Sequence, residues 1–582
     1  MIQSLRKIIR RYWLLLSLTA LLCLLILSGL AAELRPAERG IEERLAFRIQ
    51  TEDTRLPVRC WLKDDTCTVF LPSYASLDRT TAEITGGERI LLDGKALSDG
   101  MSCGSFALGT EYELSVGDRT PLRFQFLRSE NVSAMFLSTR SGSMDELHRS
   151  KAHRENADIV ILSADGTLDY HTSFTDQIRG HGNSTWDLEK KSYNLYLGKA
   201  ASLLGLSAAK KYVLISNAID DTCMRNRLIY DFASSLGSYP GFSPGCEYVD
   251  LFLNGDYAGL YLLCEKPELT MIDLDLGRES MLFELTAYGS VEDRQCFIQN
   301  EGVFVEIHTP DPCTDDQKAA LEARLQTFQS ALLSSGSSGG TASDDDTWLR
   351  DIDLDSWARK YLIEEIFENA DAGFYSQYFF WDRASDRIFA GPCWDYDGAI
   401  GMFEHFPNCF LAQRAWLNAG HYSPWYGALW QQDAYRARVL ELYRSEFAPA
   451  LDRLIQSTVP ELSDRLGTAL ELNRIRWYDA IDDVSVSVAE MTDYLKRRID
   501  FLNSAWLDGV AYHTVTLRRT PGAVFLYYCI ADGESCSALP TPEDLGADGT
   551  VWYLEDSGRV FDPETVITGD LVLTAYDPSA TE

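Results

Sequence analysis

The chain is poor in the residues that build zinc-stapled proteins, disulfide-stapled proteins and nucleic-acid-binding surfaces. It has 13 cysteines and 8 histidines among 582 residues. No Cys-x-x-Cys or Cys/His spacing typical of structural zinc occurs, and 13 cysteines are too few for a disulfide scaffold of this length. Lysine and arginine number 53 against 87 aspartates and glutamates, giving a formal net charge of −34. Because nucleic-acid affinity depends on basic residues that neutralise phosphates, we expect no DNA or RNA binding.

The chain also lacks tandem copies of any segment, which argues against a repeat protein. It is rich in apolar residues, at 46%, and in aromatic residues, at 12%. Such a composition is typical of well-packed globular domains, and the length suits roughly three or four of them.

The N-terminus carries the clearest localisation signal. Four basic residues between positions 6 and 11 precede an uncharged, leucine-rich stretch of 21 residues, 12–32. As a helix, that length spans a bilayer, and the basic flank is expected to stay in the cytoplasm. The pattern predicts a single-pass cell-membrane protein with everything after Glu33 extracellular. The alternative is a cleaved signal peptide with small residues at 29–31, which would leave the protein secreted.

Patterning after this segment suggests three further parts and an α+β fold class. Short apolar runs separated by turns predict a small β-domain over 45–127. Residues 130–505 are strand-rich at first and helical later, which suggests a two-lobed domain. Residues 510–582 return to a β pattern, and the ending at 561–571 resembles the small β-grasp repeats of bacterial surface proteins. Helical spacing predicts helices over 225–236, 315–333, 354–367, 434–458 and 485–506.

Two acidic blocks flank a short aromatic hairpin in the central part. Asn369-Ala370-Asp371 precedes predicted strands at 377–381 and 388–390, and Trp394-Asp395-Tyr396-Asp397-Gly398 follows them. A hairpin of this size brings carboxylates 24 to 26 positions apart together again. Protein kinases place a catalytic aspartate before a hairpin and a Mg²⁺-binding aspartate after it. The alternative is that one aspartate caps a helix and the others occupy a turn.

A glycine-spaced loop and two lysines offer the opposite charge. The loop Arg179-Gly180-His181-Gly182-Asn183-Ser184-Thr185-Trp186 matches neither a Walker A loop nor a Rossmann fingerprint, but its glycines would let backbone amides approach an anion. Lys190 and Lys191 follow at the start of an alternating run, and one of them is expected to face a phosphate while the other faces water. A plain turn and surface lysines are the alternatives.

These segments, with three others, resemble the CotH family, the spore-coat-type atypical kinases of bacteria. The resemblance runs in order over about residues 130–505. It rests on five blocks, namely 179–193, 217–226, a hairpin at 250–266 ending in Glu265-Lys266, 369–371 and 394–401.

The resemblance implies a divergent protein-kinase-like fold that transfers the γ-phosphoryl group of ATP to Ser or Thr of surface or coat proteins. Asp371 then corresponds to the catalytic aspartate, which accepts or orients the proton of the substrate hydroxyl. Asp395 and Asp397 correspond to the Mg²⁺ ligands, with Mn²⁺ as an alternative ion.

The resemblance also assigns the nucleotide side of the site. Lys190 or Lys191 corresponds to the lysine that contacts the nucleotide phosphates, and Glu265 is the candidate to pair with it. Arg179 and Asn183 are expected to shape the phosphate side of the pocket.

One departure from the family pattern bears on activity. Family members often carry asparagine five or six places after the catalytic aspartate, where kinases hold a second metal ion, and this chain has Ser376 and Gln377. The amide oxygen of Gln377, or alternatively the hydroxyl of Ser376, is the candidate metal ligand there. The competing hypotheses are a catalytically silent surface or spore-coat protein on a kinase-like fold, and carbohydrate processing by paired carboxylates.

Overall fold

The computed structural model describes residues 39–42, 44–52, 54–86, 89–117, 119–286, 295–300, 303–335, 346–369, 371–402, 416, 424–478, 484–520, 523–537, 539–547 and 549–576. Within these ranges no helix combines the length and the apolarity needed to cross a bilayer. The predicted anchor at 12–32 lies outside the described residues and stays a prediction.

The chain divides into two compact units. The first consists of residues 1–144, 159–168 and 250–259, and the second of 145–158, 169–249 and 260–582. In the first unit, one sheet has the strand order β2-β1-β5 and another the order β3-β4-β9-β8-β6-β7. Their strands are β1 (Leu45–Gln50), β2 (Arg55–Arg59), β3 (Trp61–Lys63), β4 (Thr66–Leu71), β5 (Thr80–Ile84), β6 (Ile90–Leu92), β7 (Lys95–Leu97), β8 (Glu111–Val116) and β9 (Leu122–Arg128).

Alternation of side chains explains how these short strands build a core. Along β1, Leu45, Phe47 and Ile49 are buried while the residues between them are partly exposed. Cys60 and Cys67 are buried free thiols in the structure.

In the second unit, the paired segments of five strands are hydrogen-bonded antiparallel in the order β17-β15-β14-β13-β11, with residues 154–157 of β11 and 262–265 of β17 taking part. They are β11 (Arg154–Leu162), β13 (Asp176–His181), β14 (Ser192–Ala201), β15 (Ala209–Ile215) and β17 (Asp256–Glu265). The other elements along this part of the chain are β10 (Ser133–Thr139), which belongs to the first unit, and α3 (Asp145–Arg149), β12 (Leu168–His171), α4 (Arg225–Leu236) and β16 (Cys246–Leu253).

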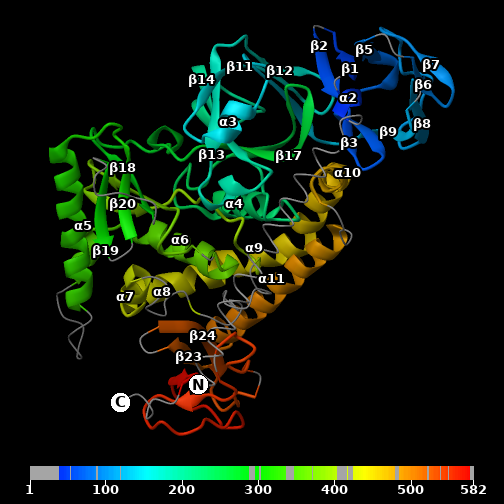
Figure 1. Cartoon of the computed structure of the whole chain (residues 1–582). Helices are drawn as coiled ribbons and strands as arrows, with labels where there is room; N and C mark the ends of the chain where they lie inside the picture. Colours follow the sequence, from blue (N-terminus) through cyan, green and yellow to red (C-terminus); the bar gives the residue numbers. More distant parts are fainter. Residues whose placement is uncertain are drawn as a thin grey trace, which may run out of the picture. The chain divides into compact units, whose positions relative to one another are not determined.

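A second sheet of this unit has the order β19-β20-β18-β21-β22. Its strands are β18 (Met281–Thr286), β19 (Cys296–Asn300), β20 (Val303–Thr309), β21 (Gln377–Asp382) and β22 (Arg387–Ala390). The pairing of Phe379 with Ala390 confirms the predicted hairpin. Helix α5 (Asp315–Ser335) runs beside this sheet (Figure 1), and Trp357 of α6 (Leu354–Phe367) packs between Phe328 of α5 and Phe379 of β21.

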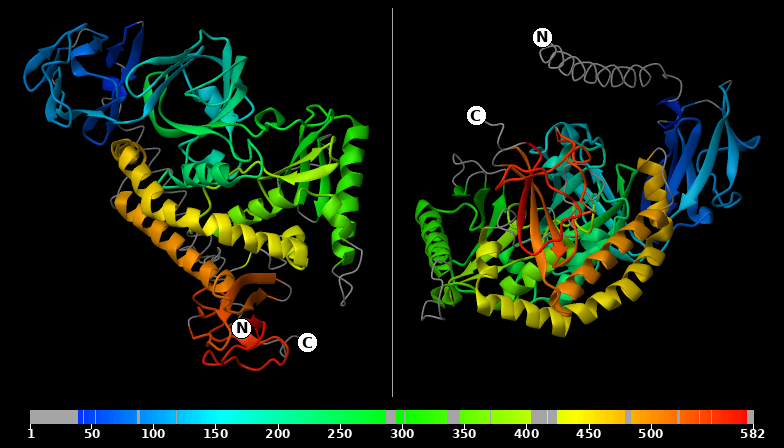
Figure 2. Two further views of the ribbon diagram at one scale, coloured as in Figure 1. Left: turned by 180° about the vertical axis from the view of Figure 1, so that it is seen from behind. Right: turned by 90° about the horizontal axis from the view of Figure 1, so that it is seen from below.

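Helices make up most of the chain after this sheet, as the spacing predicted. They are α7 (Pro424–Trp430), α8 (Asp433–Leu442), α9 (Ala448–Arg453), α10 (Val459–Trp477) and α11 (Val484–Trp506). Helices α10 and α11 run side by side (Figure 2). Helix α6 begins at its cap Asp353, whose carboxylate accepts a hydrogen bond from the Ser356 backbone N–H.

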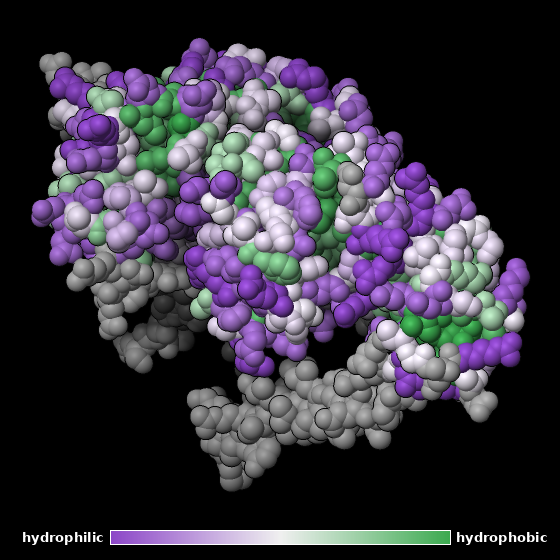
Figure 3. Space-filling view, turned by 90° about the horizontal axis from the view of Figure 1, so that it is seen from above, coloured by the Kyte–Doolittle hydropathy of each residue, from purple (hydrophilic) through white to green (hydrophobic). Residues whose placement is uncertain are grey.

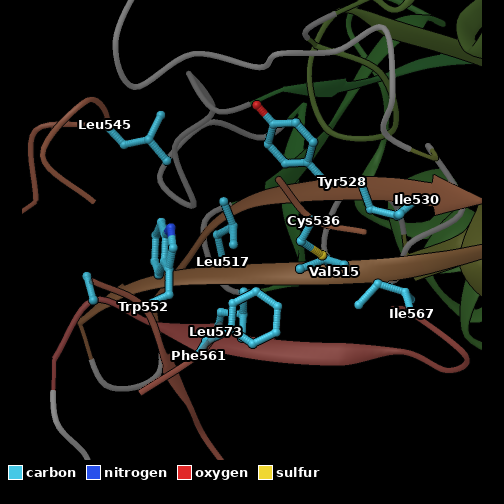
Figure 4. Close-up of a cluster of buried hydrophobic side chains, with 11 residues drawn as sticks. Val515, Leu517, Tyr528, Ile530, Cys536, Leu545, Trp552, Phe561, Ile567 and Leu573 are labelled. Carbon is cyan, nitrogen blue, oxygen red and sulfur yellow. The ribbon is translucent and has the colours of Figure 1, made fainter. Parts of the chain in front are cut away.

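The last part of the second unit is a sheet with the order β24-β23-β26-β25. It comprises β23 (Tyr512–Thr520), β24 (Ala523–Ala531), β25 (Tyr553–Leu554) and β26 (Leu571–Thr574). Val515, Leu517 and Leu573 from its strands pack with Trp552 and Phe561 in one buried cluster (Figure 4). This core is separate from the cavity described below.

The mixture of sheets and helices confirms the α+β class, and the two-lobed kinase-like arrangement stays a prediction. On the face drawn in Figure 3, hydrophilic residues predominate and hydrophobic residues form smaller areas between them. Such a surface suits a chain of net charge −34.

Candidate active site

A cavity of about 660 Å³ lies within the second unit. Segments far apart in the sequence line it, among them the glycine-spaced loop with β13, the strands β14, β18 and β20, the turn after α6, and the turn after β22. The two predicted acidic blocks and the predicted phosphate loop therefore meet at one place.

Three carboxylates form one wall of the cavity. The pKa of Asp371 is raised to about 6, first by burial and then by the charges of Asp395 and Glu364. Burial is the first cause that raises the pKa of both Asp395 and Asp397, and the charge of Asp395 raises the pKa of Asp397 further. Like charges this close cannot all ionise without a compensating cation, so the wall is poised to hold protons or a metal ion.

The backbone at Asp395 is held in an uncommon conformation. Its φ is 65°, in the left-handed region that non-glycine residues rarely adopt. The Ser376 hydroxyl donates to Asp395 Oδ2 at 2.9 Å, and the Asp395 backbone N–H donates to the Tyr230 hydroxyl at 3.2 Å. Trp394 stacks on Tyr230 with ring centroids 6.0 Å apart. These contacts fix the direction of the Asp395 carboxylate.

The start of α4 supports the same turn from behind. The Tyr396 backbone N–H donates to Asn226 Oδ1 at 2.8 Å, and Arg225 Nε donates to the Ala399 carbonyl at 2.9 Å. Arg225 is itself paired with buried Asp220 at 2.5 Å. This part of the Asn/Asp-rich block at 217–226 therefore acts as scaffolding for the acidic turn.

Basic groups line the cavity around the glycine-spaced loop. Lys151 Nζ donates to the Gly182 carbonyl at 2.7 Å and to Asn183 Oδ1 at 2.8 Å. Arg179 Nε donates to the Lys151 carbonyl at 3.1 Å. Arg179, Asn183 and Lys151 all line the cavity.

The local field on this side is positive. The pKa of His181 is lowered to about 3, first by burial and then by the charges of Lys266, Lys151 and Arg179. His181 is therefore neutral at pH 7, and the three permanent cations near it favour an anionic ligand.

The loop conformation requires its glycines. At Gly180, a Cβ would lie 2.4 Å from the Trp186 ring. Gly182 has a φ of +93°, and a Cβ there would lie 2.7 Å from Thr185 Oγ1. Because glycine has no side chain, the backbone of Gly180 and Gly182 is open to the cavity that both residues line.

A third wall comes from the second sheet. Glu284 of β18 lies directly opposite Glu306 of β20 and opposite Tyr378 of β21. His308 Nε2 lies 2.7 Å from Glu284 Oε2, and the His308 ring stacks on Tyr378 with centroids 5.3 Å apart. All four side chains line the cavity.

A family model described as CotH kinase protein matches residues 178–502, more than half of the chain. The chain belongs to the CotH kinase protein family. Apart from Lys151, every residue that lines the cavity lies in this CotH region. A search of curated proteins gave no match.

The lysines expected at the CotH nucleotide site lie elsewhere in the structure. Lys190 is 4% exposed, and its Nζ donates to the carbonyls of Ser216 and Leu260 and to Asn473 Oδ1 at 2.7 to 2.8 Å. Lys191 Nζ donates to the carbonyls of Trp186 and Leu188. Neither belongs to the described residues that line the cavity.

Lys190 and Lys191 do not line the cavity because strand β14 begins only after them, at Ser192. Regular alternation starts at Ser192, and Ser192, Asn194 and Tyr196 are the residues of β14 that line the cavity. Lys190 precedes the strand and turns inward. Lys151, Arg179 and Lys266 are the basic residues that this CotH region and its neighbouring segment bring to the cavity.

Two other residues expected at the site, Glu265 and Gln377, are also absent from the described cavity lining. Glu265 is buried and accepts hydrogen bonds from the backbone N–H groups of Ser207 and Gly245, so it braces two loops and lies outside the cavity lining. Gln377 is fully buried, and neither polar atom of its amide has a hydrogen-bond partner. On β21 its neighbour Tyr378 lines the cavity, and alternation turns Gln377 to the opposite face.

Two ligands are implied for a CotH kinase domain: ATP and a divalent cation. The Asp395–Asp397 pair offers the crowded oxygen ligands that hard cations prefer. Asn194 lines the cavity at 7% exposure, and its Oδ1 has no hydrogen-bond partner in the described structure. The residues present therefore fit a metal-bound polyphosphate.

Several of these residues were missed in the sequence. Glu306 and His308 lie two positions apart on β20, and no pattern in the sequence indicated that Glu284 lies opposite Glu306. Lys266 is the last residue of the hairpin block at 250–266, but Glu265 beside it was the residue expected at the site. Lys151 lies 28 positions before Arg179, and no local pattern marks it.

Proposed function

We propose that this protein is a Mg²⁺-dependent protein kinase that transfers the γ-phosphoryl group of ATP to Ser or Thr of surface or spore-coat-type proteins. One observation carries the proposal: Asp371, Asp395 and Asp397 share a single cavity with Lys151, Arg179 and Lys266. Phosphoryl transfer is catalysed mainly by positioning and by charge stabilisation, and this cavity supplies both signs of charge.

Asp371 is proposed to accept the proton of the substrate hydroxyl or to orient it. A pKa near 6 leaves its carboxylate ionised at neutral pH and still basic enough to take a proton. Asp395 and Asp397 would hold the divalent cation, which neutralises phosphate charge when bound. Ser376 fixes the orientation of Asp395 through its hydrogen bond.

Lys151, Arg179 and Lys266 are proposed to bind the phosphates, with Asn183 ordering Lys151. This set takes the place of the strand lysine expected from the sequence. Charge-assisted hydrogen bonds of this kind are roughly twice as strong as neutral ones. The membrane anchor at 12–32 and the extracellular location remain part of the proposal.

The direct test is incorporation of labelled phosphate by the full-length chain with Mg²⁺ and ATP, into itself and into surface proteins. Asp371→Asn and Asp395→Asn are each expected to reduce incorporation at least 100-fold, the scale of losing a general base or an electrostatic stabiliser. Asp464→Asn, on the exposed face of α10, is the matched control. Unchanged incorporation by the two cavity variants would refute the assignment.

A catalytically silent protein on the same fold is the alternative outcome. It predicts no labelled product with the wild type, whatever the substrate or metal ion. Mass spectrometry of the products identifies the acceptor residues if transfer occurs.

A further inference from the structure

We propose that Glu284, Glu306 and His308 bind a second divalent cation, of the transition-metal class represented by Mn²⁺, in the same cavity. The inference deepens the proposed function, since the cavity is shared, but the cation can be detected without catalysis. Three lines of geometry and charge support it.

The first is the convergence of ligand atoms. One ligand atom from each of the three side chains lies within 4.8 Å of the other two. Glu284 and Glu306 face each other across antiparallel strands, an arrangement in which like charges destabilise a sheet unless a cation lies between them.

The second is a β-bulge that adds the histidine to this pair. Leu282 pairs with Thr309 and Phe283 pairs with Ile307, so His308 is the extra residue of β20. Bulges re-aim a side chain and are common next to active sites. Here the bulge leaves His308 Nε2 beside the Glu284 carboxylate.

The third is the charge balance of the cavity. Among the described residues, five carboxylates line it, against the cations Lys151, Arg179 and Lys266. A triphosphate adds more negative charge, which a single divalent cation at Asp395 and Asp397 does not offset. Glu284 and Asp395 line the same cavity, so the two acidic groups face one space.

Of the two positions where family members carry asparagine, Ser376 lines the cavity and contacts Asp395, and Gln377 is turned away. Gln377 lies on the opposite strand face from Tyr378 and is fully buried. Asn194, more than nine-tenths buried and lining the same cavity, keeps an unpartnered Oδ1 among the described residues, which independently indicates a ligand there.

The ligand set indicates the class of metal. Mg²⁺ prefers oxygen ligands in strict octahedral geometry, whereas imidazole with carboxylates suits transition metals. The site at Asp395 and Asp397 offers oxygens alone. The two sites therefore differ in their preference, and Mg²⁺ is expected to compete well at only one of them.

The experiment titrates Mn²⁺ alone into the full-length chain and counts bound ions by the loss of the free Mn²⁺ resonance in electron paramagnetic spectra. The wild type is expected to bind two ions. His308→Ala and Glu306→Gln are each expected to bind one, and Mg²⁺ in about tenfold excess is expected to displace one ion from the wild type. His513→Ala, which removes a histidine paired with Asp532, is the control and keeps two.

The outcomes separate this inference from the proposed function. Two ions in both His308→Ala and Glu306→Gln, or a single wild-type ion that is lost in Asp395→Asn, would overturn the second site and leave the first. No bound ion in the wild type would overturn both. Circular dichroism of each variant confirms that a lost ion does not reflect unfolding.

Discussion

Replacing Asp371 by asparagine is expected to stabilise the metal-free protein while it abolishes phosphoryl transfer. The carboxyl group has a pKa of about 6 in the folded protein against an ordinary 3.8, because burial and the charges of Asp395 and Glu364 oppose its ionisation. A difference of this size corresponds to about 3 kcal/mol of lost stability at neutral pH. Asparagine has nearly the same shape and cannot ionise, so Asp371→Asn avoids the loss.

The sign of the effect fixes its dependence on pH. Because the pKa of Asp371 is raised on folding, its contribution to stability is fully present below pH 3.8 and is lost as the pH rises through about 6. Wild type and Asp371→Asn should therefore unfold at the same temperature near pH 3.5. At pH 7.5 the variant should unfold about 4 °C higher, the shift that about 3 kcal/mol produces in a domain the size of the CotH region.

Thermal unfolding followed by tryptophan fluorescence, in the presence of a chelator and at several pH values, makes the measurement. Asp464→Asn removes an exposed aspartate of α10 and should show no such pH-dependent gain. A variant that is less stable than wild type at pH 7.5, or equally stabilised at every pH, would refute the electrostatic account of the acidic wall.

Three further predictions concern the walls of the cavity. Lys151→Ala should weaken nucleotide binding about tenfold or more, measured by calorimetry, because Lys151 lines the cavity. Lys191→Ala should change the nucleotide affinity less than threefold, because Lys191 donates to the Trp186 carbonyl instead. Equal losses of affinity in the two variants would contradict this assignment. Asp220→Ala should destabilise the CotH region by about 3 to 5 kcal/mol in denaturant unfolding, since it leaves Arg225 charged, buried and uncompensated; a loss below about 1 kcal/mol would count against that pairing. Gly182→Ala should lower nucleotide affinity and cost about 1 kcal/mol or more of stability, because alanine is strained at a φ of +93°; wild-type affinity would show that the loop does not approach the ligand.

Local patterns in the sequence were enough to place the acidic wall. Asp371 follows a well-marked helix, and the aromatic hairpin after it has clear alternation and a polar turn, so the return of the chain to Asp395 could be predicted. The α+β class followed from the same periodicities.

Arg179 and Asn183 were expected on the basic wall and line the cavity, but its lysines could not be predicted, because their positions depend on where a strand begins and on strand pairing. Alternation extended by two residues would bring Lys190 onto the face of Ser192 and Asn194, but the strand starts at Ser192 and Lys190 turns into the interior. Lys151 reaches the cavity only through the pairing of β11 with β13, which no local pattern specifies.

The third wall depends on strand register. Glu284 and Glu306 meet because β18 pairs with β20, and the bulge at His308 shifts one residue relative to the regular ladder. A shift of one position would turn every side chain to the other face. Such a register is decided by packing of the whole sheet and cannot be read from either strand alone.

The central claim is that the cavity binds a metal-bound nucleotide between its acidic and basic walls. Calorimetric titration of a non-hydrolysable ATP analogue into the full-length chain tests this most directly, with and without a divalent cation. The account predicts binding that requires Mg²⁺ or Mn²⁺ and that is lost in both Asp395→Asn and Lys151→Ala. Binding that is independent of metal, or no binding at millimolar analogue with metal present, would contradict it.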